Sequence, residues 1–305
     1  MSPALKRAAT IAGGLLCVLA AALLVARGIA LRETLGERLA QLSPSAFAAS
    51  LGLYTAGSLL LGIAWVALVR VASAGHPRAR PLFRAHLRAQ VAKYLPGNVF
   101  HFAYRHFAAR REGVAHASLA AALGLEAALL LAAAGVIALG AVTDPRLDAL
   151  VPWARPLVWL VPLLAVVAWL ALSFVAPRFG VPAAPLMQRA PRLALVLVIN
   201  LVFFALAGTA LRELHPQSDA LPFSAWCGWL SLAWLVGYVT PGAPAGLGLR
   251  EAVLALGLAP ALGDAEALAL ALLYRLVTVA ADGIVAVLGF LPWPAAGDGG
   301  LKPTL

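Results

Sequence analysis

Two groups of residues in this chain could bind a negatively charged group, and each lies beside a Pro-Gly pair that interrupts an apolar segment. The first group is Lys93, His101 and Arg105, which flank the break at Pro96-Gly97. His101 and Arg105 are four residues apart, so they share one face of a helix. We expect this group to form a cationic pocket for a phosphate-bearing headgroup.

The first break also predicts a new helix N-terminus. Pro96 lacks an N–H donor and disfavours helix at the residue before it. Gly97 permits backbone conformations closed to other residues, and Asn98 is well placed to cap a helix that begins after it. The free N–H groups of such a terminus favour an anion. An interfacial amphipathic hairpin, whose basic side chains touch only lipid phosphates, is the alternative interpretation.

The second break lies between Thr240 and Glu251 and is richer in glycine and proline. An arginine at the bilayer centre costs about 2.5–3.5 kcal/mol on insertion scales. Arg250 and Glu251 are therefore expected to be paired or to face a water-filled cavity, although Glu251 is also favourable near a helix N-terminus on structural grounds alone. The substrate-binding candidates here are Pro241, Gly242, Gly246, Gly248, Arg250 and Glu251.

Three more ionisable residues interrupt apolar segments and are expected to form an intramembrane charge network. They are Glu126, Arg275 and Asp282, of which the last two are seven apart and share a helix face. Exposing them to lipid would be expensive, so we expect pairing within the bundle. A structural clamp of Glu126 with Arg275 or Arg250 is as well supported as a role in substrate binding.

The composition places all these residues in a membrane. The chain of 305 residues is 62% hydrophobic and 12% charged, whereas soluble domains carry about 25% charged residues. Its mean hydropathy is +0.90. In a bilayer, irregular backbone is tolerated only where it is buried in protein or lines a wet cavity. Two broken helices in separate parts of such a chain point to a substrate site.

We therefore predict an all-α, polytopic bundle with about seven to eight spans and two re-entrant broken-helix elements. Residues 1–292 are expected to form one transmembrane domain, followed by a disordered tail at 293–305. About 20 apolar residues cross the bilayer core. The expected re-entrant elements are 82–110 and 241–263, the second with a short helix from Leu249 to Leu258. The expected spans are 8–30, 47–69, 117–141, 157–175, 193–211, 223–240 and 265–291.

The distribution of charge predicts the orientation of the bundle. The N-terminus, residues 70–116 and the loop 176–192 carry fourteen Lys and Arg residues, against six in the loops expected on the opposite side. The positive-inside rule makes the richer side, and with it the N-terminus, cytoplasmic. Because the basic residues of this chain, with its net charge of +10, sit in short loops between apolar runs, they indicate lipid headgroups rather than nucleic acid.

No catalytic residue, cofactor or metal ion is expected. The chain has no His-Glu-x-x-His, no Gly-x-Ser-x-Gly and no P-loop, and its six histidines lack metal-ligand spacing. Both cysteines, Cys17 and Cys227, fall in apolar segments, where each is expected to be a small buried hydrophobe.

The residues Lys93 to His101, and the run Pro241-Gly242 to Gly246-Leu247-Gly248-Leu249-Arg250-Glu251, resemble two signatures of the lysylphosphatidylglycerol synthase transmembrane (flippase-like) family. That family includes the lipid-translocating half of the multiple peptide resistance factors. The second run departs from the more usual Pro-Gly-Gly-Leu-Gly string, because Ala243, Pro244 and Ala245 lie between Gly242 and Gly246. The resemblance implies a multi-pass protein of the cell inner membrane with re-entrant helices, and we do not expect this chain to transfer lysyl groups from tRNA.

Three functions are open from sequence. The leading hypothesis is a lipid flippase-like transporter that moves an anionic phospholipid or a polyprenyl-phosphate glycolipid between leaflets. A non-transporting membrane partner of a glycosyltransferase is the alternative, and a lipid-modifying enzyme is disfavoured because no nucleophile or metal constellation is present. Association with a second copy of the chain is left open.

Overall fold

The computed structural model describes residues 42–73, 75, 77–94, 100–142, 186–216, 218–240 and 244–292, together with residues 26, 29, 33, 36 and 37. Within these ranges the chain is helical, with short turns and no strand, which confirms the predicted all-α class. The expected spans at 8–30 and 157–175 and the tail at 293–305 lie outside the described residues, apart from two isolated positions in or near the first span.

Four of the described helices are long and apolar enough to cross a membrane. Each has at least 27 residues, which is about 40 Å of helix at about 1.5 Å per residue and exceeds the roughly 30 Å hydrocarbon core. The chain is therefore a multi-pass membrane protein. These helices are α3 (Pro44–Ala72), α6 (His116–Val142), α9 (Leu186–Glu213) and α12 (Asp264–Phe290).

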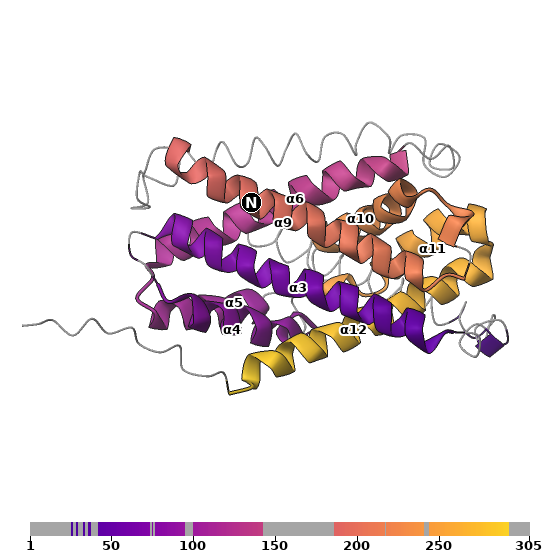
Figure 1. Cartoon of the computed structure of the whole chain (residues 1–305), viewed down its shortest axis with the longest axis horizontal. Coiled ribbons are helices and arrows are strands. Elements are labelled where there is room, and N and C mark those ends of the chain that lie inside the picture. The colour runs from indigo at the N-terminus through magenta and orange to yellow at the C-terminus, as the bar shows by residue number, and fades with distance from the viewer. Residues whose placement is uncertain are drawn as a thin grey trace, which may run out of the picture.

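The segment expected as the first broken element forms a helical hairpin. It consists of α4 (Ala79–Ala89), the 3₁₀ turn η1 (Gln90–Tyr94) and α5 (Phe100–Arg111). α4 packs against α5, and an ion pair of 2.8 Å joins Arg78, before α4, to Glu112, after α5. The start of α4 and the end of α5 therefore lie at the same end of the bundle (Figure 1). The connecting residues 95–99, which include Pro96, Gly97 and Asn98, lie outside the described residues.

The second broken element forms a hairpin together with the apolar helix that precedes it. α10 (Phe223–Val239) has 17 residues, fewer than the about 20 that cross a bilayer, and the 3₁₀ turn η4 (Pro244–Gly246) follows it. α11 (Leu249–Leu262) then returns antiparallel to α10, since Gly257 lies against Trp229 and Gly237 lies against Arg250. Pro241 and Gly242, at the turn between them, lie outside the described residues. A short turn, η3 (Ser218–Ala220), precedes α10.

The two hairpins enter the bundle from opposite ends. α5 leads directly into the first residue of α6, whereas α10 begins beside the other end of α6, where Gly140 lies against Ser224. Their tips meet in the interior, because η1 contacts η4 and α12. Figure 1 shows α4 and α5 at one end of the long helices and α11 at the other.

Small residues bring α6, α9 and α10 into very close contact. A Cβ on Gly140 would overlap the carbonyl oxygen of Ser224, and a Cβ on Gly228 would overlap the backbone nitrogen of Ala141. A Cβ on Gly208 would overlap the thiol of Cys227. Cys227 is 4% exposed and makes no disulfide, as the sequence predicted. Only glycine fits at these crossings, so helix packing here is backbone against backbone.

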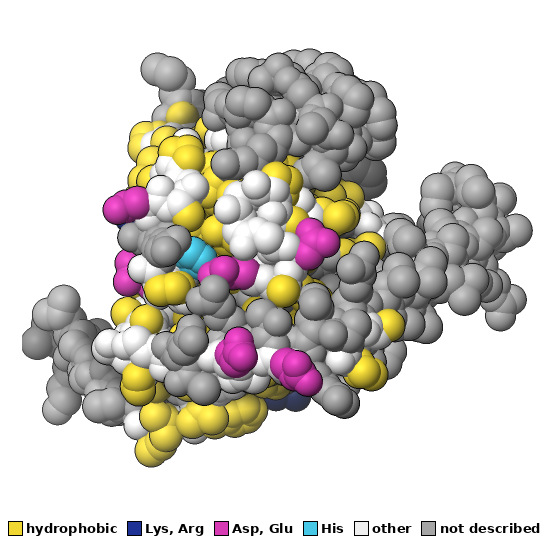
Figure 2. Space-filling view, turned by 90° about the vertical axis from the view of Figure 1, so that its right-hand side faces the viewer, with side chains coloured by type: hydrophobic (Ala, Val, Ile, Leu, Met, Phe, Trp, Pro, Cys, Tyr) yellow, Lys and Arg dark blue, Asp and Glu magenta, His cyan; other side chains and the backbone are white. Residues whose placement is uncertain are grey.

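The two ends of the bundle differ in charge. The end at which the first hairpin enters carries Arg78, Arg80, Arg84, Arg88, Arg110 and Arg111. The opposite end carries Glu213, Asp219, Asp264 and Glu266, and Figure 2 shows acidic side chains and a histidine gathered on it. The basic end is the one that the loop charges assign to the cytoplasm.

Candidate functional site

The tip of the first hairpin is fastened to α12 by a single carboxylate. Lys93 Nζ lies 2.7 Å from Asp282, and the hydroxyl of Tyr94 donates to the same carboxylate. Asp282 is 1% exposed, and a carboxylate buried to this degree requires charged or hydrogen-bonding partners. The expected network residue Asp282 thus neutralises the expected binding residue Lys93.

A second buried ion pair joins α5 to α6. The guanidinium of Arg105 donates to both oxygens of Glu126, at 2.7 and 2.8 Å, which is the bidentate geometry that makes such pairs strong. Arg105 is 4% exposed and lies over the ring of Trp65, 4.4 Å from its centroid. The clamp predicted for Glu126 is therefore wrong in its partner. The first hairpin packs against α6 and brings Arg105, rather than Arg275 or Arg250, to Glu126.

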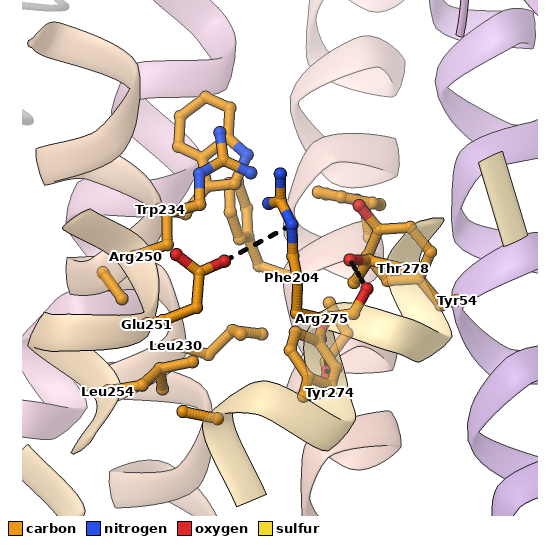
Figure 3. Close-up of a pocket in the computed structure, with 14 residues that line it drawn as sticks. Tyr54, Phe204, Leu230, Trp234, Arg250, Glu251, Leu254, Tyr274, Arg275 and Thr278 are labelled. Carbon is orange, nitrogen blue, oxygen red and sulfur yellow. Dashed lines mark hydrogen bonds and ion pairs between the residues drawn. The ribbon is translucent and has the colours of Figure 1, made fainter. Parts of the chain in front are cut away.

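The third pair organises the tip of the second hairpin. One carboxylate oxygen of Glu251 accepts from the backbone N–H of Gly248 at 2.6 Å, which caps the start of α11. The other lies 3.4 Å from Nε of Arg275 on α12, as the dashed line in Figure 3 shows. Arg275 also donates to the carbonyl of Ala245 at 3.3 Å. Ala245 has φ 50°, a left-handed conformation that costs a non-glycine residue about 1–2 kcal/mol, and Arg275 helps to hold it.

Arg250 differs from the other three cations because no carboxylate pairs with it in the described part of the chain. Its guanidinium lies over the ring of Trp234, 5.4 Å from the centroid, and Figure 3 shows the two side chains together. Its buried Nε has no hydrogen-bond partner. A Cβ on Gly237 would lie 2.6 Å from Cγ of Arg250, so the absence of a side chain there makes room for the arginine.

A cavity of about 130 Å³ lies between the two hairpins and has room for several water molecules or a group of phosphate size. A smaller cavity of about 40 Å³, drawn in Figure 3, shares Arg250 and Trp234 with it and also contains Glu251 and Arg275. The larger cavity is lined by residues of both hairpins and of the long helices, among them Tyr54, His86, Gln90, Lys93, His101, Arg105, Glu126, Trp234, Tyr238 and Arg250.

Two histidines of the first hairpin line this cavity in the neutral state. Burial, with help from the charges of Arg105 and Lys93, lowers the pKa of His101 to about 3. Burial and the same two cations hold the pKa of His86 well below 6.5. Nδ1 of His101 is buried without a hydrogen-bond partner. His101 and Arg105 both face the cavity, as their four-residue spacing suggested.

The described candidates from the two breaks come together from opposite ends of the bundle. Lys93, His101, Arg105 and Arg250 line the larger cavity. Gly246 and Gly248 have φ of 69° and 84° and form the turn into α11. Sequence reasoning missed His86, Gln90, Tyr54 and Tyr238. Trp234 could have been singled out from the sequence, because it lies in the middle of an apolar segment and tryptophan is usually enriched at the membrane–water interfaces.

Neither the family models nor the curated proteins contain a match to this chain. Among the described residues, no three His, Cys, Asp or Glu side chains lie close enough together to hold a metal ion. The described part of the site combines a polar hollow inside an apolar bundle with three internal ion pairs and one cation, Arg250, that no described carboxylate pairs.

Proposed function

We propose that this protein is a flippase-like transporter of the cell inner membrane, which binds an anionic phospholipid or a polyprenyl-linked glycolipid and moves it between leaflets. The headgroup would occupy the cavity between the hairpin tips, and the acyl or prenyl tails would remain in lipid. Arg250, Arg105, Lys93 and His101 would contact the headgroup.

The arrangement of the hairpins supports this proposal. Each hairpin has both outer ends at one end of the long helices, and the tips meet inside. In a membrane both elements would then be re-entrant, one from each face, and a site at their tips would lie near the midplane, as in transporters built from broken helices. The basic end of the bundle would face the cytoplasm, and the site could then open to either side.

The observation that carries the proposal is Arg250. A half-buried guanidinium with no carboxylate partner among the described residues is expensive inside a membrane, and the fold makes room for its side chain at Gly237 and places it in the lining of a cavity. A purely structural arginine would be expected to have a partner such as those of Arg105 and Arg275. An anionic ligand supplies the missing charge. The resemblance of the two broken segments to the flippase-like family points in the same direction.

The test is a leaflet-exchange assay in liposomes with fluorescently labelled phosphatidylglycerol and, separately, a labelled prenyl-linked sugar. Purified protein is expected to accelerate exchange of at least one of them, and Arg250→Met is expected to abolish that acceleration at equal protein content. The matched control is Arg78→Met, because the side chain of Arg78 is 78% exposed at the basic end and is not among the residues that line the cavity. This control is expected to leave exchange unchanged.

Exchange no faster than in protein-free liposomes, for both lipids, would contradict transport. If the inactive protein also purified in a fixed ratio with a glycosyltransferase, the result would favour the non-transporting partner instead. Equal loss of exchange in Arg250→Met and Arg78→Met would remove Arg250 from the site.

A further inference from the structure

We infer that the ligand of this cavity carries a single negative charge on a phosphodiester, rather than the two charges of a phosphomonoester or the greater charge of a pyrophosphate. This inference rests on the proposed function and narrows its substrate class. It follows from the balance of charge around the two cavities, where three cations are each matched by a carboxylate and one cation is not.

The pairing is one to one. Lys93 is matched by Asp282, Arg105 by Glu126 and Arg275 by Glu251. Each carboxylate is 18% exposed or less, so none is available to a solvent cation. Arg250 remains, and its charge is the net charge of the described site.

Among the described residues, the surroundings of the larger cavity add no further charge to this balance. His86 and His101 line the larger cavity but are neutral near pH 7, because burial and the neighbouring cations lower their pKa values. Residues 95–99 and 241–243, which join the hairpin helices, contain no ionisable side chain. The other side chains that line the larger cavity are neutral.

Unused hydrogen-bonding groups lie around the same hollow. Nε of Arg250, Nε of Arg105 and Nδ1 of His101 are buried without partners, and all three residues line the larger cavity. Unsatisfied buried nitrogen atoms are rare in folded proteins and call for a ligand or water. A phosphodiester has two free oxygens that accept such bonds, and its single charge equals the charge of Arg250.

A second ligand charge would have no counterpart in the part of the chain that the structure describes. At pH 8 a phosphomonoester, with a second pKa of about 6, carries close to two negative charges. Bound here it would leave one buried charge uncompensated, which membrane interiors strongly disfavour. An uncharged headgroup would instead leave Arg250 unpaired, so both are expected to bind more weakly.

The experiment measures binding of short-chain phosphatidylglycerol, phosphatidic acid and diacylglycerol to the purified full chain at pH 8. The native protein is expected to bind phosphatidylglycerol at least tenfold more tightly than either of the others. Two variants add one positive charge to the site: Glu126→Gln removes a carboxylate, and Gln90→Lys adds a cation beside Lys93 while leaving the Arg105 pair intact. Each is expected to shift the preference at least tenfold toward phosphatidic acid, whereas Glu213→Gln, at the exposed acidic end, leaves it unchanged.

Equal or tighter binding of phosphatidic acid by the native protein would overturn the single-charge inference, even if the protein exchanges lipids between leaflets. An unchanged preference in a folded Gln90→Lys protein would overturn it as well, and this variant decides if Glu126→Gln does not fold. Preferential binding of phosphatidylglycerol without leaflet exchange would support the charge balance and contradict transport. Binding of none of the three lipids would contradict both.

Discussion

Replacing Arg250 by methionine is expected to stabilise the lipid-free protein, whereas the same replacement of Arg105 is expected to destabilise it. Both arginines line one cavity, and methionine keeps an unbranched stem of similar reach in each case. The structure distinguishes them by their partners. Arg105 has a bidentate carboxylate at 2.7 and 2.8 Å, and Arg250 has no carboxylate among the described residues.

The magnitudes follow from these contacts. Removing one member of a buried ion pair costs about 3–5 kcal/mol because the other charge is left uncompensated, so Arg105→Met should lower the free energy of unfolding by that amount. For Arg250→Met, relief of an unsatisfied buried donor contributes about 1–3 kcal/mol. Loss of the contact with Trp234 at 5.4 Å subtracts about 0.5–2 kcal/mol. The net expectation is a gain of about 1 kcal/mol.

Equilibrium unfolding of delipidated protein in mixed micelles measures both free energies. Arg78→Met serves as the reference, because its ion pair is exposed and is expected to change stability by about 0–1 kcal/mol. Adding phosphatidylglycerol should then stabilise the native protein but not Arg250→Met, since ligand binding stabilises only the state that binds. If Arg250→Met proved as destabilising as Arg105→Met, Arg250 would have a structural partner and the charge balance of the site would be wrong.

Three further outcomes are expected. Gly237→Ala should slow lipid exchange with only a modest loss of stability, because the added Cβ lies 2.6 Å from Cγ of Arg250 and displaces that side chain. An exchange rate equal to that of the native protein would show that the position of Arg250 is unimportant. The thermal unfolding temperature should fall as the pH drops below about 6.5, because His86 and His101 stay neutral in the fold and take up protons on unfolding. His101→Asn should make the unfolding temperature depend less steeply on pH. An identical dependence in the variant would contradict the role of His101. Asp282→Asn should loosen the first hairpin tip, detected as faster hydrogen exchange in η1, and unchanged protection there would contradict its role as the anchor.

The sequence was sufficient to predict the helical class and the four long apolar helices, because a run of more than 20 apolar residues has few alternatives in a membrane. It also predicted that residues beside both Pro-Gly breaks contribute to one binding site. It could not assign partners to the buried charges. Glu126 pairs with Arg105 from the first hairpin, and nothing in the spacing of these residues distinguishes that arrangement from a pair with Arg275.

The sequence also could not show whether α10 crosses the membrane or forms one arm of a hairpin. Its 17 residues are apolar throughout, and hydropathy alone cannot tell a short span from one arm of a hairpin. In the structure α11 returns antiparallel to α10, with Gly257 against the ring of Trp229. Likewise, Glu251 could have served as a cap or as a ligand group, and its carboxylate is occupied by the cap of α11 and by Arg275.

The glycine crossings of α6, α9 and α10 limit how this molecule can change shape. Main chain lies on main chain at Gly140 and Gly228, and Gly208 lies against Sγ and Cα of Cys227, so few side chains lie at these crossings to repack and we expect the three helices to move as one rigid body. The contact of the first hairpin with α12 is close as well. A Cβ on Gly289 would lie 3.0 Å from the backbone nitrogen of Arg88, and the side chains of Arg84 and Arg88 donate to the carbonyl of Gly289 at 3.0 and 2.8 Å. Any displacement of the α4–α5 hairpin relative to the rest of the bundle would therefore have to break two buried links, that of Lys93 with Asp282 on α12 and that of Arg105 with Glu126 on α6.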